Sequence, residues 1–195
     1  MNNHDFWKDK KVQKYDIGLF TTLQDNNVID VLTNIGLPFI DQDYHRFYPI
    51  NSLQYFQKQF IVLGTPFEQS TSFHDNLVLL DLSSQKIYYY NEAVFKIGLA
   101  PSITTIMNDS LESFLYYHQK MFEYINRFCN GSHAFQKAEV ISVFKALVVD
   151  LLRKDSLGLG SIHNHQLFWR RSLSELKTDI EERYEEVIVI SSLFS

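Results

Sequence analysis

The order of apolar and polar positions divides the chain into a strand-rich first half and a helical second half. Three apolar runs, at Phe60–Leu63, Asn76–Leu82 and Lys86–Asn91, have the length and composition typical of strands. The last two flank a short polar connection that begins at Asp81, and this arrangement predicts a β-hairpin. A further short strand is expected at Ile103–Met107.

The segment before these strands predicts one helix and a bend. Apolar residues recur at helical spacing in Asn27–Ile35, and Gly36 followed by Pro38 is a common way for a helix to end. The first fifteen or so residues are polar, and we expect them to be loose. Pro49 argues against a central strand at its position, because proline has no N–H to donate.

After residue 108 the apolar spacing changes to that of helices. We expect a long helix from Leu111 to Ile125, capped by Asp109, with Glu112 reaching back to the free amide. Two more helices are expected around Val140–Leu152 and around Phe168–Ile180. The glycines at 158 and 160 indicate a loop between them.

Strands followed by helices predict an α+β protein with a mostly antiparallel central sheet, flanking helices and a helical C-terminal part. We expect one domain over residues 1–195, with a core at about 28–125 and a helical extension at about 133–195. Whether these C-terminal helices pack on the sheet or form a separate lobe stays open at this point.

Composition narrows the possible partners. The net charge of −5 argues against nucleic-acid binding, which needs clustered basic residues, and it fits a basic protein partner. Cys129 is the one cysteine, so no internal disulfide can form. The N-terminus lacks the apolar run of a signal peptide, and no stretch approaches the roughly 20 apolar residues of a membrane span. We therefore expect a cytoplasmic protein without a membrane partner.

The sequence contains few motifs that indicate catalysis or ligand binding. The sequence has no phosphate-binding glycine loop and no nucleophile elbow. His163 and His165 could ligate a metal, although a polar loop is the commoner meaning of such a pair. Cys129 ends an amphipathic helix and is interpreted as a packing residue. We expect no catalytic residues, no cofactor and no metal.

Each of two surface patterns allows two interpretations. The acidic run of residues 175–186 is either a solvated helix face or a patch that meets a basic partner. On a strand, Tyr88 and Tyr90 share one face while Tyr89 points the other way. These tyrosines are either core and half-exposed sheet surface, or a contact surface.

The order of several short motifs resembles that of the SUKH superfamily, in particular its fourth group of immunity proteins. These motifs are Gly36-Leu37-Pro38, a strand that ends at Gly64, the aromatic strand Ile87–Tyr90, Asn108-Asp109-Ser110-Leu111 with Phe114-Leu115, and a late Phe168-Trp169. The chain departs from the family at Ser84-Gln85, where the hairpin glycine is absent, and at Pro66–His74, which carries no family signature.

The resemblance implies a bacterial cytoplasmic protein that neutralises a toxin domain, often a nuclease or a nucleic-acid deaminase, without cofactor or catalytic residues. From the expected loops and the exposed strand face, we select as candidate toxin contacts Asp41, Asp43, Tyr44, Glu68, Asp75 and Tyr89. An adaptor of the same fold without a toxin partner is the alternative. A metal enzyme that uses His163 and His165 is the third hypothesis.

Overall fold

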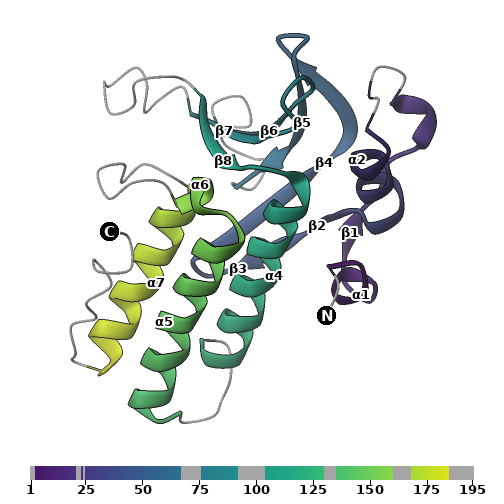
Figure 1. Cartoon of the computed structure of the whole chain (residues 1–195). Helices are drawn as coiled ribbons and strands as arrows, with labels where there is room; N and C mark the ends of the chain where they lie inside the picture. Colours follow the sequence, from purple (N-terminus) through teal and green to yellow (C-terminus); the bar gives the residue numbers. More distant parts are fainter. Residues whose placement is uncertain are drawn as a thin grey trace.

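A curled six-stranded antiparallel sheet, whose main part lies in the upper half of Figure 1, organises the fold. The computed structural model describes residues 3–20, 23, 25–66, 76–91, 104–129, 135–159 and 168–184. Each strand pairs with the next along the chain, in the order β3 (Ile40–Gln42), β4 (His45–Phe56), β5 (Phe60–Thr65), β6 (Asn76–Asp81), β7 (Ile87–Asn91) and β8 (Thr104–Asn108). The predicted strands and the β6–β7 hairpin are therefore confirmed.

Three long helices lie side by side below the sheet (Figure 1). They are α4 (Leu111–Phe128), α5 (Lys137–Lys154) and α7 (Phe168–Tyr184), and the short helix α6 (Ser156–Leu159) follows α5. The sequence therefore predicted the α+β architecture and its helical C-terminal part correctly. None of the described helices is long and apolar enough to span a membrane.

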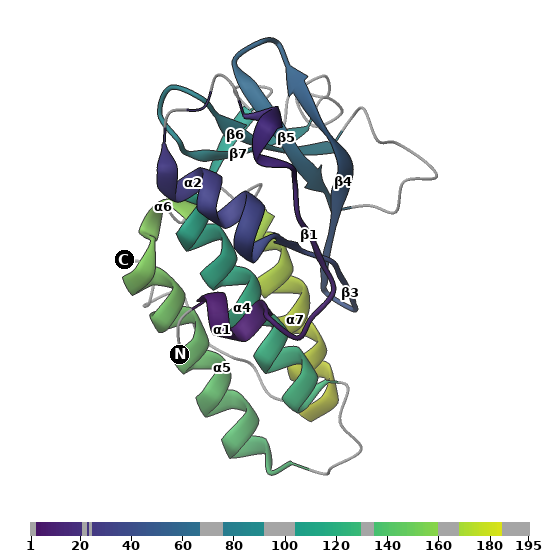
Figure 2. The same cartoon turned by 90° about the vertical axis from the view of Figure 1, so that its right-hand side faces the viewer.

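The N-terminal segment packs beside β4 and α4 (Figure 2). Its elements are α1 (Asn3–Trp7), β1 (Val12–Gln13), the 3-10 helix η1 (Ile17–Leu19), α2 (Asn26–Asp30), the π-helical turn η2 (Val31–Ile35) and β2 (Leu37–Pro38), which pairs with β1. The expectation of a loose start was wrong for the described part. Trp7 is almost fully buried, and its ring lies 5.9 Å from that of Phe122 on α4.

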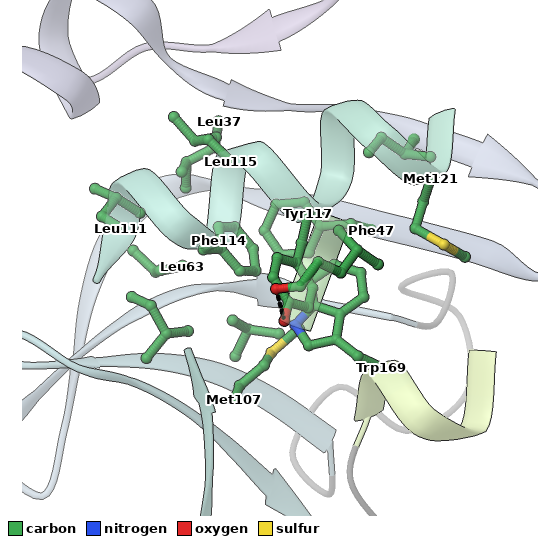
Figure 3. Packing of buried hydrophobic residues seen from close by; sticks show 14 of the residues in the cluster. Leu37, Phe47, Leu63, Met107, Leu111, Phe114, Leu115, Tyr117, Met121 and Trp169 are labelled. Carbon is green, nitrogen blue, oxygen red and sulfur yellow. Dashed lines mark hydrogen bonds between the residues drawn. The ribbon is translucent and has the colours of Figure 1, made fainter. Parts of the chain in front are cut away.

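The C-terminal helices share one hydrophobic core with the sheet, and Trp169 of α7 connects them (Figure 3). Its fully buried indole lies 5.1 Å from the ring of Tyr117 on α4 and 6.0 Å from that of His45 on β4. Burying an aromatic side chain of this size stabilises the fold by about 2–3 kcal/mol. The helices around Trp169 are therefore part of the main body of the protein.

A buried polar network fixes the junction of β8, α5 and α7. Asn108, which is fully buried, accepts a hydrogen bond from the indole N–H of Trp169 at 2.8 Å and donates one to Asp155 at 2.9 Å. Asp155 also accepts from the backbone N–H of Asp109 and of Leu157. Because buried polar groups are costly without partners, this network specifies how the helices dock.

The fold explains why glycine is needed at two positions in the short motifs described above. Gly36 adopts a φ of 88° where η2 ends, a conformation that favours glycine. A Cβ at Gly64 would lie 2.5 Å from the carbonyl oxygen of Tyr48 and 2.7 Å from the ring of Phe47, because the paired strands β4 and β5 approach closely there. In the hairpin that lacks the usual glycine, Gln85 itself adopts a φ of 58°.

Three local expectations were wrong. Pro49 lies inside β4, paired with Gly64, because β3 pairs with β4 only as far as Phe47 and the strand therefore needs no N–H on that side. Ser110, one residue after the expected cap, caps α4 by accepting from the backbone N–H of Ser113 at 3.2 Å.

The third correction concerns the expected glycine loop after α5. Gly158 lies in the short helix α6, whose start is held by the hydrogen bond from Leu157 to the Asp155 carboxylate. A Cβ at Gly158 would meet the carbonyl oxygen of Met107 at 2.7 Å. The glycine therefore serves close packing of α6 on β8; residue 160 lies outside the described residues.

Candidate binding surface

The β3–β4 turn brings three of the predicted contact residues together. Asp43 and Tyr44 form a two-residue connection, and Asp41 precedes it on β3. The Asp41 and Asp43 side chains are 61% and 77% exposed, and the Arg46 guanidinium lies 3.7 and 3.8 Å from their carboxylates. Ion pairs this long and exposed contribute little stability, so both carboxylates are available to a partner.

Tyr44 ties this turn to α7. Its φ of 64° is left-handed, a conformation that costs a non-glycine residue about 1–2 kcal/mol. The phenol donates a hydrogen bond to the Asp179 carboxylate at 2.9 Å, and this bond, with burial and the negative charge of Asp179, raises the pKa of Tyr44 to about 12. The turn is thus held in one conformation against a helix.

Two further bonds hold the flanks of the turn. The buried Tyr48 donates its hydroxyl hydrogen to Asp41 at 2.7 Å, and Gln42 donates to the side-chain oxygen of Asn126 on α4 at 2.9 Å. The β3–β4 turn therefore rests on both α4 and α7. We call Asp41, Asp43, Tyr44 and Arg46 the turn surface; it presents fixed negative charge on a rigid support.

The other predicted contacts lie elsewhere. Tyr89 is half-buried on β7, where its hydroxyl donates to Asn76 at 2.7 Å and its ring lies 5.6 Å from that of Phe168. Burial raises the pKa of Tyr89 above its ordinary value. These contacts fit the structural interpretation of Tyr89. Glu68 and Asp75 lie outside the described residues.

The acidic run on α7 is largely neutralised within the helix. Ion pairs with spacing of four residues join Arg171 to Glu175 at 2.9 Å, Lys177 to Glu181 at 2.7 Å and Arg183 to Asp179 at 2.6 Å. Such pairs are typical of a solvated helix face. The described part of the run, up to Tyr184, therefore supports the first of its two interpretations.

The ionisable groups with the most perturbed pKa values lie in the core. His45 Nε2 and His118 Nδ1 are 2.7 Å apart, and both side chains are buried. Burial lowers the pKa of His45 to about 3 and that of His118 well below its ordinary value. Both imidazoles are neutral at pH 7 and enclosed by aromatic rings, so a substrate has no access to them. Sequence reasoning missed this pair because 73 residues separate its members.

The described residues give little support for catalysis by a thiol or for metal binding. Burial raises the pKa of Cys129 to about 11 despite the opposing charge of Arg183, so its thiol is protonated at pH 7. In the described ranges no group of three or more His, Cys, Asp or Glu side chains could hold a metal ion. His163 and His165 lie outside those ranges.

Comparison with known proteins returns no matching family model, no matching curated protein and no matching solved structure.

Proposed function

We propose that the chain is a non-enzymatic immunity protein that binds a bacterial toxin domain of the nuclease or nucleic-acid deaminase type and covers its active site. The observation that carries this proposal is the turn surface: two exposed carboxylates, Asp43 on the β3–β4 turn and Asp41 on the strand before it, which bonds of Tyr44 and Tyr48 hold in place. Rigid presentation lowers the entropic cost of binding, which favours a tight complex.

The charge of the turn surface suits this type of partner. Enzymes that act on nucleic acids carry basic side chains where phosphates bind. Asp41 and Asp43 would face such a groove, while the net charge of −5 attracts the basic partner from a distance. This electrostatic term speeds association more than it strengthens the final complex.

The motif order that resembles the SUKH superfamily also supports the proposal. Four residues of these motifs have a structural role in this fold: Gly36 at a turn, Gly64 where two paired strands approach closely, Asn108 at a buried junction and Trp169 in the core. A set of motifs that maintains a fold leaves the contact residues free to vary, as an immunity protein with its own specific toxin requires.

Co-expression with the toxin encoded beside this gene tests the proposal. Cells that produce both proteins should survive, and cells that produce the toxin alone should die. The absence of an adjacent toxin gene, or equal killing with and without this protein, would refute the proposal. A stable complex that leaves the toxin active would instead favour the adaptor alternative.

A charge reversal tests the role of the turn surface. Asp41→Lys/Asp43→Lys should slow association with the toxin by about tenfold or more at low salt, because steering depends on charge. The matched control is Asp30→Lys, compared with the single variant Asp43→Lys, which changes the net charge by the same amount; Asp30 is an exposed acid on α2, which lies away from β3 in both views (Figures 1 and 2). Equal association rates for Asp43→Lys and the control would exclude the turn surface.

A further inference from the structure

An aromatic hollow lies at the other end of β4 from the turn surface. It has a volume of about 360 Å³ and is lined by Phe56, Gln57, Gln59, Phe60, Asp81, Tyr88 and Tyr90. The ring centroids of Phe56 and Tyr90 are 4.9 Å apart, and those of Phe60 and Tyr88 are 5.8 Å apart. The hollow and the turn surface thus lie at the two ends of the twelve-residue strand β4.

Asp81 gives this hollow a fixed negative charge. Asp81 is only 5% exposed. Burial raises its pKa, but hydrogen bonds from the Ser83 hydroxyl and N–H, from the Ser84 N–H and from Gln59 outweigh burial, so the pKa lies below its ordinary value. Among the described residues, no Lys or Arg forms an ion pair with Asp81. Four hydrogen bonds, rather than a cation, therefore stabilise the charge of this nearly buried carboxylate.

Strained backbone surrounds the same hollow. The described residues contain four non-glycine residues with positive φ, and three of them, Gln57, Lys58 and Gln85, lie in the two turns that border it. Each such residue costs about 1–2 kcal/mol that a glycine would avoid. Tight hairpin turns commonly require left-handed residues, so these three fix the shape of the turns that border the hollow.

We propose that the hollow binds the guanidinium group of an arginine on a protein partner. Flat cations are attracted to the faces of aromatic rings, and guanidinium stacks on them better than ammonium does. The Asp81 carboxylate supplies the opposite charge, and burial strengthens that attraction. This inference is independent of the proposed toxin contact, since the hollow and the turn surface occupy opposite ends of β4.

The test uses the full chain and a small probe. N-acetyl-arginine amide is titrated into ¹⁵N-labelled protein, with N-acetyl-citrulline amide as the uncharged probe of nearly the same shape and N-acetyl-lysine amide as the ammonium probe. We expect arginine to bind with a Kd on the order of millimolar, as one cation–π and ion-pair contact allows, and to shift amide resonances of Phe56, Tyr88 and their neighbours. Citrulline should cause no comparable shifts, and lysine should bind more weakly.

Two variants separate binding from folding. Asp81→Asn keeps an oxygen acceptor for the turn and removes the charge, and Tyr88→Leu removes one half-exposed ring; each should weaken arginine binding about tenfold. Tyr55→Leu is the control, because Tyr55 is exposed on the neighbouring position of β4 and does not line the hollow. No shifts up to about 50 mM arginine, equal binding of citrulline or lysine, or unchanged binding by both variants would overturn the proposal.

Discussion

Acid should destabilise this protein through its buried histidine pair. The rings of Phe47, Phe114 and Trp169 surround His45 and His118, and His45 Nδ1 and His118 Nε2 have no hydrogen-bond partner among the described residues. Both pKa values lie below the ordinary value in the folded state. The stability that the pair contributes is therefore fully present above about pH 6.5 and is lost as the pH falls towards the folded-state values.

The size of the effect follows from His45. With a folded-state pKa of about 3 and an unfolded value of about 6.5, the free energy of unfolding falls by about 2 kcal/mol between pH 8 and pH 5. Protonation of His118 also lowers the free energy of unfolding as the pH falls. At pH 5 its contribution is at most about as large as that of His45. The pair therefore removes about 2–4 kcal/mol at pH 5, a large fraction of an ordinary folding stability.

Urea unfolding at several pH values between 5 and 8 measures this loss. The double variant His45→Leu/His118→Leu removes both titrating groups and should reduce the difference between pH 8 and pH 5 by about 2–4 kcal/mol. Ile125→Val is the control: it should lower stability by about 1 kcal/mol at every pH and keep the original pH dependence. Parallel curves for the wild type and the double variant would show that the histidine pair does not cause the loss of stability in acid.

Three further substitutions test the packing, each by urea unfolding at pH 7. Gly64→Ala should cost about 3 kcal/mol, because its Cβ would meet backbone and ring atoms of β4; a loss below about 0.5 kcal/mol would contradict that close approach. Asn108→Ala should cost about 2–4 kcal/mol by leaving Trp169 and Asp155 without their shared partner, and an unchanged midpoint would rule out that network. Lys58→Gly should stabilise by about 1 kcal/mol by relieving its left-handed φ of 59°, whereas destabilisation would show that the strain is absent.

The elements that sequence reasoning found correctly are those with a strong local pattern. The apolar run at Phe60–Leu63, the hairpin that turns at Asp81 and the stripe of α4 all depend on neighbours within a few positions. The N-terminal helix was missed because its evidence is the burial of Trp7 against α4, a contact across more than a hundred residues. Pro49 was misjudged because strand pairing decides which N–H groups are needed.

For the candidate surfaces, too, sequence reasoning found what local patterns show and missed what distant contacts decide. We selected Asp41, Asp43 and Tyr44 because they were expected to be exposed, and the structure brings them to one turn. The hydrogen bond from Tyr44 to Asp179 spans 135 residues, however, and has no local signal in the sequence. The period of two placed Tyr88 and Tyr90 on one face correctly, and both line the aromatic hollow. That Phe56 joins them from another hairpin could not be deduced from the tyrosines alone.

Inhibition of a toxin by the purified protein is the decisive measurement for the proposed function. If the proposal holds, the gene has a toxin gene beside it; that toxin domain is held at a fixed concentration, its activity on nucleic acid is measured, and this protein is added in increasing amounts. We expect activity to disappear near an equimolar ratio, and we expect the Asp41→Lys/Asp43→Lys variant to reach that inhibition about tenfold more slowly at low salt. Full toxin activity in the presence of an excess of the wild-type protein would contradict the proposal.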